Sequence, residues 1–115
     1  MNIHAIPWHE QFQKGFDLVL QSSMSDQDSY KDVSQKYYGT REYGQSINLH
    51  SLATPQNAEK QLFMMGLNAG RRYVGDMVTS GAHCSVPFTF KIIETDEQTT
   101  IEMRFTMTTD AETAA

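Results

Sequence analysis

The side chains of this chain that could bind a metal ion are few and scattered. The histidines and the single cysteine are His4, His9, His50, His83 and Cys84. Zinc-binding helices pair two histidines four positions apart, and zinc fingers use closely spaced cysteine pairs, but neither pattern occurs here. We therefore predict no metal site and no cofactor, and we expect the histidines to be ordinary surface or packing residues.

Nucleophilic catalysis by Cys84 is the second chemistry to consider. Cys84 lies in a predicted loop, residues 81–85, between a predicted helix and a predicted hairpin. Neighbouring residues rarely turn their side chains toward each other, so His83 is a poor base for this thiol. Reactivity also needs an electropositive setting, which the sequence does not show. We expect a small half-buried residue. A small enzyme or ligand-binding domain, with a pocket at His83, Cys84 and Arg72, is the alternative.

Aromatic and basic residues are interleaved between positions 36 and 43. The residues that we predict to bind a partner are Tyr37, Tyr38, Arg41, Glu42 and Tyr43. Such a mixture can stack on single-stranded nucleic acid, and Tyr and Arg are also enriched at protein–protein hot spots. The acidic balance of the chain favours a protein partner. The plainer alternative is a helix end whose tyrosine rings cover the core.

A long predicted helix carries two further features, an arginine pair and a glycine pair. Arg71 and Arg72 could clamp a carboxylate or a phosphate. More often such residues join solvated ion pairs, here with Asp76 four positions after Arg72. Gly66 and Gly70 lie one turn apart and remove side-chain bulk, which allows a neighbouring backbone to approach closely. We predict this glycine face as a self-association surface.

Two segments have the apolar spacing of a helix. In residues 7–23, Pro7 suits the first helical position, and apolar residues recur three and four positions apart. Thr54 and Pro55 form a start signal, and Gly81 an end signal, for a helix over residues 55–79. Apolar residues cover more than half of the second helix, whereas a surface helix needs a stripe of only about 100°. We therefore expect it to be buried on two sides.

The chain between these two helices is harder to interpret. Ser25 and Asp28 resemble a capping box, which predicts a second short helix over residues 26–38 that ends at Gly39. Residues 39–44 are bracketed by two glycines and are predicted to form a loop. Residues 45–52 alternate weakly and fit a short strand, which would add a third strand to the sheet.

A C-terminal β-hairpin is the clearest element. Apolar residues alternate at Val86, Phe88, Phe90 and Ile92, and again at Ile101, Met103, Phe105 and Met107. A register that sets Ile92 opposite Ile101 places all of them on one face and sets Lys91 opposite Glu102 on the other. A turn at residues 96–97 and a four-residue loop over 95–98 both keep this register.

Length and charge narrow the class of protein. The chain has 115 residues and a formal net charge of -5, which is the size of one domain. A single cysteine excludes an internal disulfide. No stretch is apolar enough for a signal peptide or a membrane span, so we expect a cytoplasmic protein, or one that acts in a host cytoplasm. The predicted fold class is α+β: two short N-terminal helices, one long central helix and a C-terminal antiparallel hairpin. Residues 1–110 would form the domain and 111–115 a disordered tail.

These observations favour a non-enzymatic protein that docks on a protein partner. Its finer form would be a small acidic inhibitor of a nucleic-acid-processing enzyme, of the phage host-takeover or anti-defence type, an analogy of size and charge alone. Direct binding of nucleic acid is not expected, because phosphate neutralisation needs a basic surplus. A small enzyme and a self-associating structural subunit, such as a homodimer through Gly66 and Gly70, remain the alternatives.

Overall fold

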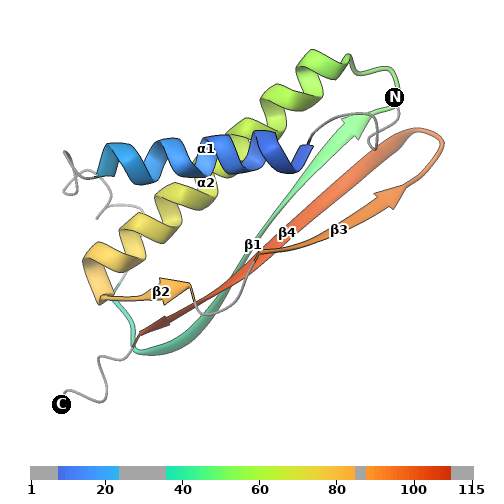
Figure 1. The fold of residues 1–115 in the computed structure, drawn as a ribbon. Coiled ribbons are helices and arrows are strands. Elements are labelled where there is room, and N and C mark those ends of the chain that lie inside the picture. Colours follow the sequence, from blue (N-terminus) through green and yellow to red (C-terminus); the bar gives the residue numbers. More distant parts are fainter. Residues whose placement is uncertain (1–7, 24–35, 85–87, 110–115) are drawn as a thin grey trace.

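The computed structural model describes residues 8–23, 36–84 and 88–109, in which two helices lie on the same side of an antiparallel sheet (Figure 1). In chain order the elements are α1 (Trp8–Ser23), β1 (Gly39–His50), α2 (Pro55–Ser80), β2 (His83–Cys84), β3 (Thr89–Glu94) and β4 (Gln98–Thr109). The predicted α+β class is therefore confirmed, although the number and order of the elements differ from the prediction.

Strand β4 is the centre of the sheet. It pairs along its whole length with β1 on one side. On its other side it pairs with β3 near its beginning and with the short β2 near its end. The sheet is thus three strands wide, and β1 forms one complete edge of it.

The hairpin of β3 and β4 forms in the predicted register. The cross-strand pairs that confirm it are Ile92 with Ile101, Phe90 with Met103 and Lys91 with Glu102. The backbone N–H of Thr95 donates to the carbonyl of Gln98 at 2.9 Å, which closes the turn at residues 96–97. Phe88 precedes β3, yet its ring centroid lies 5.3 Å from that of Phe105, so the two side chains still meet across the strands.

The prediction for residues 39–44 was wrong, because they belong to a strand and not to a loop. Strand β1 runs without a break from Gly39, opposite Thr109, to His50, opposite Gln98. The two glycines suggested that regular structure is interrupted here. Of the two, Gly39 has a positive φ, of 98°, and stands at the first position of the strand, whereas the φ of Gly44 is not positive. A twelve-residue β4 offers a complete row of backbone partners, and pairing with it outweighs the weak local preference of the segment.

The predicted helix over residues 26–38 lies mostly outside the described residues. Where it can be compared, it was wrong: Lys36 to Tyr38 are not helical and lead directly into β1. The stretch around Cys84, predicted as a loop, forms the short strand β2 instead. The predicted tail over residues 111–115 is outside the described residues.

Both ends of α2 are capped as the sequence predicts. The Thr54 side chain accepts a hydrogen bond from the N–H of Asn57 at 3.2 Å, and Pro55 occupies the first turn. At the other end Gly81 adopts a left-handed φ of 69° and donates its N–H to the carbonyl of Met77 at 3.0 Å. These caps fix the helix at Pro55–Ser80, one residue longer than predicted.

Helices α1 and α2 touch at their backbones through glycines. A Cβ atom on Gly66 would collide with the carbonyl oxygen of Phe12, and one on Gly15 with that of Phe63. A Cβ on Gly70 would lie 2.8 Å from the Cβ of Val19. The close neighbour of Gly66 and Gly70 is therefore α1 of the same chain rather than a second copy.

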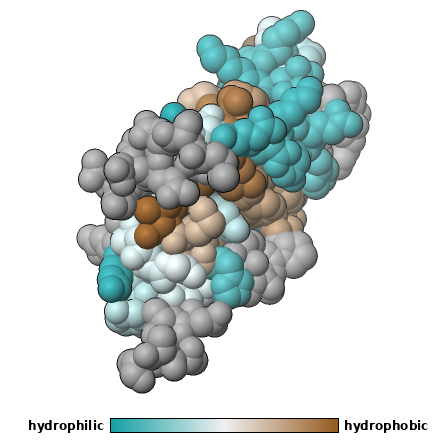
Figure 2. Space-filling model, turned by 60° about the vertical axis from the view of Figure 1, so that its left-hand side comes forward, coloured by the Kyte–Doolittle hydropathy of each residue, from teal (hydrophilic) through white to brown (hydrophobic). Residues whose placement is uncertain are grey.

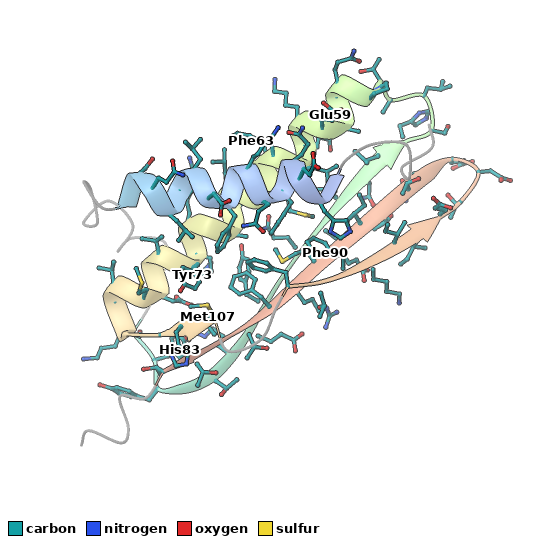
Figure 3. The ribbon with its side chains drawn as sticks, viewed as in Figure 1. Glu59, Phe63, Tyr73, His83, Phe90 and Met107 are labelled. Carbon is teal, nitrogen blue, oxygen red and sulfur yellow. The ribbon has the colours of Figure 1, made fainter. Side chains whose placement is uncertain are left out.

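The core fills the space between this helix pair and the sheet. The largest cluster of buried side chains comprises Phe12, Phe16, Met65, Ala69, Ala82, Met103, Phe105 and Met107. In Figure 3, Tyr73 and Phe90 point into this space from α2 and β3. Their rings meet Phe16 and Phe12 edge-on, with centroids 5.6 and 5.2 Å apart. A smaller cluster of Leu49, Ala58, Leu62 and Ile101 continues the core toward the start of α2. The long helix is thus buried on two sides, by α1 and by the sheet.

Replacement of Gly66 tests the contact between the helices. In an isolated helix, Gly66→Ala would raise the free energy of unfolding by about 1 kcal/mol. Against the Phe12 carbonyl the added methyl group must displace backbone, so we expect a loss of about 1–3 kcal/mol or more. The matched control is Gly44→Ala, where the nearest atoms, Arg104 Cγ and Met103 O, lie at 3.4 Å. Urea unfolding measures both, and a stabilised Gly66→Ala variant would contradict the contact.

Candidate protein-binding surface

Strand geometry divides the predicted binding residues between two faces of the sheet. Side chains alternate along β1, and the odd-numbered residues are the less exposed ones. Arg41 and Tyr43 therefore face the helices, whereas Glu42 faces the open side. Tyr38, which precedes the strand, is 58% exposed, and the Lys36 ammonium lies 5.7 Å from its ring centroid.

Tyr37 is anchored to the end of α2. Its backbone N–H donates to the hydroxyl of Ser80 at 3.0 Å, and its own hydroxyl donates to Asp76 Oδ2 at 3.4 Å. The guanidinium carbon of Arg41 lies 4.1 Å from the centroid of the Tyr37 ring. This distance is within the range of a cation–π contact, so the ring holds the arginine in place.

The same surroundings change the acidity of the Tyr37 hydroxyl. Burial raises its pKa from 10.0 to about 12, and the negative charge of Asp76 acts in the same direction. The positive charge of Arg41 opposes the shift by favouring the phenolate. The neutral phenol is therefore the form that the folded protein favours.

The predicted ion pair between Arg72 and Asp76 is absent from the described structure. Asp76 is only 1% exposed, its Oδ2 accepts the hydroxyl of Tyr37, and its Oδ1 has no hydrogen-bond partner there. Arg72 instead lies over the ring of Tyr43, at 5.1 Å from the centroid. Arg72 and Tyr43 thus form a second arginine–tyrosine stack. Its tyrosine lies two positions after Arg41, the arginine of the first stack.

A groove runs between β1 and α2 and consists of two adjoining hollows, which we call the β1–α2 groove. One hollow, of about 270 Å³, is lined by Tyr43, Gln45, Asn68, Arg71 and Arg72. The other, of about 320 Å³, is lined by Gln45, Ile47, Asn57, Lys60, Gln61, Met64, Met65 and Asn68. Between them the Gln45 side-chain amide donates to the carbonyl of Met65 at 3.1 Å, which ties the strand to the helix.

The groove is positively charged in a negatively charged protein. Lys60, Arg71 and Arg72 line it, and no carboxylate does. Within the described residues none of these cations forms an ion pair, although the chain carries a net charge of -5. The charges are therefore segregated, with unpaired cations collected beside β1.

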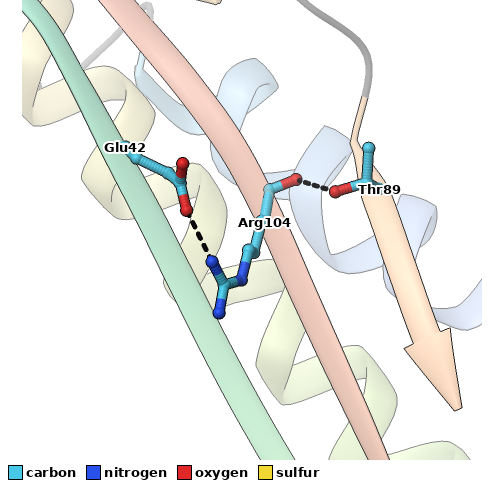
Figure 4. A network of polar contacts seen from close by, with 3 residues as sticks. All are labelled: Glu42, Thr89 and Arg104. Carbon is cyan, nitrogen blue, oxygen red and sulfur yellow. Dashed lines mark hydrogen bonds and ion pairs between the residues drawn. The ribbon is translucent and has the colours of Figure 1, made fainter.

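On the open face of the sheet, by contrast, the polar groups satisfy one another. Arg104 on β4 binds Glu42 on β1 at 2.8 Å, and the hydroxyl of Thr89 on β3 donates to the Arg104 carbonyl at 3.4 Å (Figure 4). The ion pair is largely exposed and contributes little stability. The hydroxyl of Thr100 similarly donates to the side-chain oxygen of Asn48 at 2.7 Å. On this face, these side chains bind one another across neighbouring strands.

Apolar surface also remains exposed. Figure 2 shows one face on which hydrophobic residues lie between hydrophilic regions. Met64, which lines the groove, is 43% exposed. A partner that covers it would gain from the removal of apolar surface from water.

Sequence reasoning identified only part of this groove. It singled out Tyr43, Arg71 and Arg72, but not Lys60 or Met64. The missing residues lie on the same row of α2 as Arg72, since Lys60, Met64, Asn68 and Arg72 recur every four positions. This row of α2 residues borders β1 only because the residues from Gly39 onward form a strand. The prediction of a loop there gave no reason to place the two segments side by side.

The described histidines are His9, His50 and His83. The His9 ring meets Phe90 edge-on at 5.1 Å, and Nδ1 of His50 accepts the backbone N–H of Leu52 at 3.0 Å. His83 is exposed on β2. In the part of the chain that the structure describes, no three His, Cys, Asp or Glu residues come together as metal ligands would.

Of the residues of the alternative pocket, His83 and Arg72 are not brought together. His83 lies on β2, on one side of β4, whereas Arg72 contacts Tyr43 of β1 on the other side. His83 lines neither hollow of the groove. The Cys84 side chain and His4 lie outside the described part of the chain.

Known protein families, curated proteins and solved structures contain no match to this chain. Neither described helix combines the length and the apolar character needed to cross a bilayer. The β1–α2 groove and the two arginine–tyrosine stacks are thus the features on which a function can be based.

The raised pKa of Tyr37 predicts a pH dependence of stability. The folded state holds the phenol proton more tightly than the unfolded chain does. The stability that depends on this proton is therefore present below pH 10 and is lost as the pH rises through about 12. Tyr37→Phe should lower the free energy of unfolding by about 1 kcal/mol at pH 8. The difference should shrink above pH 10, in urea titrations with Tyr38→Phe as control; a constant difference would contradict the prediction.

Proposed function

We propose that this protein is a non-enzymatic binding module that docks on a protein partner through the helix-facing side of β1. The observation that supports it most directly is the pair of stacks, Arg41 on Tyr37 and Arg72 on Tyr43. Arginine and tyrosine are enriched at interface hot spots. A stacked guanidinium is also held in place beforehand, so less side-chain entropy is lost when a partner binds.

Charge points to the chemistry of the partner. Arg41, like the cations of the groove, has no acidic partner within the described residues. An acidic surface patch would supply the missing carboxylates, and unlike charges would also accelerate the encounter. Glu42, included in the predicted binding set, faces the opposite side of the sheet and pairs with Arg104. The proposed surface therefore comprises Tyr37, Arg41 and Tyr43, extended by Arg71 and Arg72, with the exposed Tyr38 next to it in the chain.

The finer form of this proposal is an inhibitor of a nucleic-acid-processing enzyme. That role needs carboxylates that occupy a basic channel on the enzyme. In the described structure exposed carboxylates occur at the hairpin tip, on Glu94, Asp96 and Glu97, and none lines the β1–α2 groove. Docking through the arginines and inhibition by acidic mimicry would thus use different residues, and the geometry favours the docking role.

Capture of the partner tests the docking surface. We expect Arg41→Gln together with Arg72→Gln to abolish retention of a protein that the wild-type chain captures from lysate, because both stacks lose their charge. Lys14→Gln together with Lys91→Gln removes the same charge from exposed positions elsewhere and is the matched control. Quantitative mass spectrometry of the captured proteins, with circular dichroism to verify the fold, is the measurement.

Only a protein that the wild type and the control retain, and the Arg41/Arg72 variant loses, supports the proposal. If the Arg41/Arg72 variant retains the same proteins as the wild type, the surface is not the docking site. If the control loses them as well, the effect comes from net charge and not from the stacks.

A further inference from the structure

The outer edge of β1 is open for further pairing. Ser51 donates its N–H to the carbonyl of Glu97 at 2.8 Å, in line with the β1–β4 register. Because ladder bonds alternate between antiparallel strands, the odd-numbered residues of β1 bond to β4. The even-numbered residues, including Glu42, Gly44 and Ser46, turn their N–H and C=O groups outward. At the end of the strand the His50 carbonyl accepts the N–H of Ala53 at 2.9 Å, and within the described residues no other backbone group bonds to this edge.

This edge borders the β1–α2 groove, whose hollows are lined by residues of β1 and α2 alone. An extended peptide laid along β1 would pair with its backbone and direct alternate side chains into the groove, as in other peptide-binding folds that add a strand to a sheet. We propose that the β1–α2 groove binds an extended acidic segment of the partner protein, which joins the sheet as a strand beside β1. The inference rests on the proposed function and specifies how the partner is held.

Apart from Arg41, which stacks on Tyr37, the edge lacks the usual protection against such pairing. Natural edge strands are often short or carry lysine or proline, which discourage a neighbouring strand. Strand β1 has twelve residues, contains neither lysine nor proline, and has an exposed glycine, Gly44, near its middle. Its only acidic side chain, Glu42, already binds Arg104 on the open face.

The spacing of charges along the groove defines the segment that fits. Lys60 and Arg71 are eleven residues apart on α2, which is about 16 Å along the helix axis. Met64 lies between them, opposite Ile47 of β1. In an extended chain, side chains four residues apart are separated by about 14 Å. A matching segment therefore has an acidic, an apolar and an acidic residue at every second position. Because this pattern is symmetric, the segment fits the groove whether it runs parallel or antiparallel to β1.

A second copy of this chain fits the edge less well. Pairing of two β1 edges would place two cationic grooves next to each other, and neither copy would bring carboxylates to them. Like charges held close together oppose association. An acidic segment of another protein instead neutralises the groove.

A designed peptide tests the inference directly. The probe is fluorescein-labelled Thr-Glu-Thr-Leu-Thr-Glu-Thr with blocked ends, and its binding to the full-length protein is followed by fluorescence anisotropy. We expect saturable binding that weakens at least tenfold between about 50 and 500 mM NaCl, because the contacts include exposed charges. The same peptide with lysine in place of glutamate should not bind. A peptide N-methylated at every residue, which cannot donate to β1 in either direction, should bind at least tenfold more weakly.

Two protein variants separate strand addition from simple charge attraction. Ser46→Pro removes an outward N–H, and proline is tolerated at such a position of an edge strand. It should weaken binding at least tenfold, whereas Ser46→Ala, which keeps the N–H, should stay within twofold of the wild type. If Ser46→Pro does not fold, the N-methylated peptide applies the same test to the unchanged protein.

The outcomes also separate this inference from the proposed function. It is overturned if the peptide does not bind, or if its binding ignores both Ser46→Pro and N-methylation. It is equally overturned if oligothymidylate binds the groove more tightly than the peptide, or if light scattering finds a dimer that Ser46→Pro dissociates. A partner that depends on Arg41 and Arg72 but is retained by Ser46→Pro would leave the docking function intact and reject strand addition alone.

Discussion

The glycine contact between α1 and α2 fixes how the long helix is rotated over the sheet. Gly66 and Gly70 must face α1, because no side chain fits between the backbones there. With 3.6 residues per turn, Leu62 and Met65 then point into the core. The remaining side, which includes Met64 and Arg71, is left beside β1. One tight backbone contact therefore decides which side chains of α2 border the edge strand.

The alternation of β1 completes the separation of charges. Arg41 and Tyr43 are turned toward α2, and Glu42 is turned toward the open face, where it meets Arg104. Had the segment been a loop or a helix, Glu42 would have been able to approach the arginines. Because the strand keeps it on the other face, the positive charge of the groove is not neutralised from within the segment, and an acidic chain retains a basic surface.

The elements with strong local signals could be predicted from sequence. The caps at Thr54 and Gly81 marked α2, and the alternating residues of the hairpin set its register. Strand β1 could not be recognised, because its polar residues pair with a strand some seventy residues later, Gly39 with Thr109, and local patterns do not contain that information. The Tyr and Arg residues were identified as binding candidates, but their combination with Lys60 and Met64 required the tertiary fold.

The central position of β4 affects how the protein is made. Every other described strand of the sheet pairs with β4, and β4 follows all of them in the chain. The ribosome therefore synthesises β1, α2 and β3 before β4, and the sheet can form only after β4 has emerged. Until then the apolar side chains of α2 and of the β3 segment stay exposed, which is the condition in which growing chains depend on chaperones.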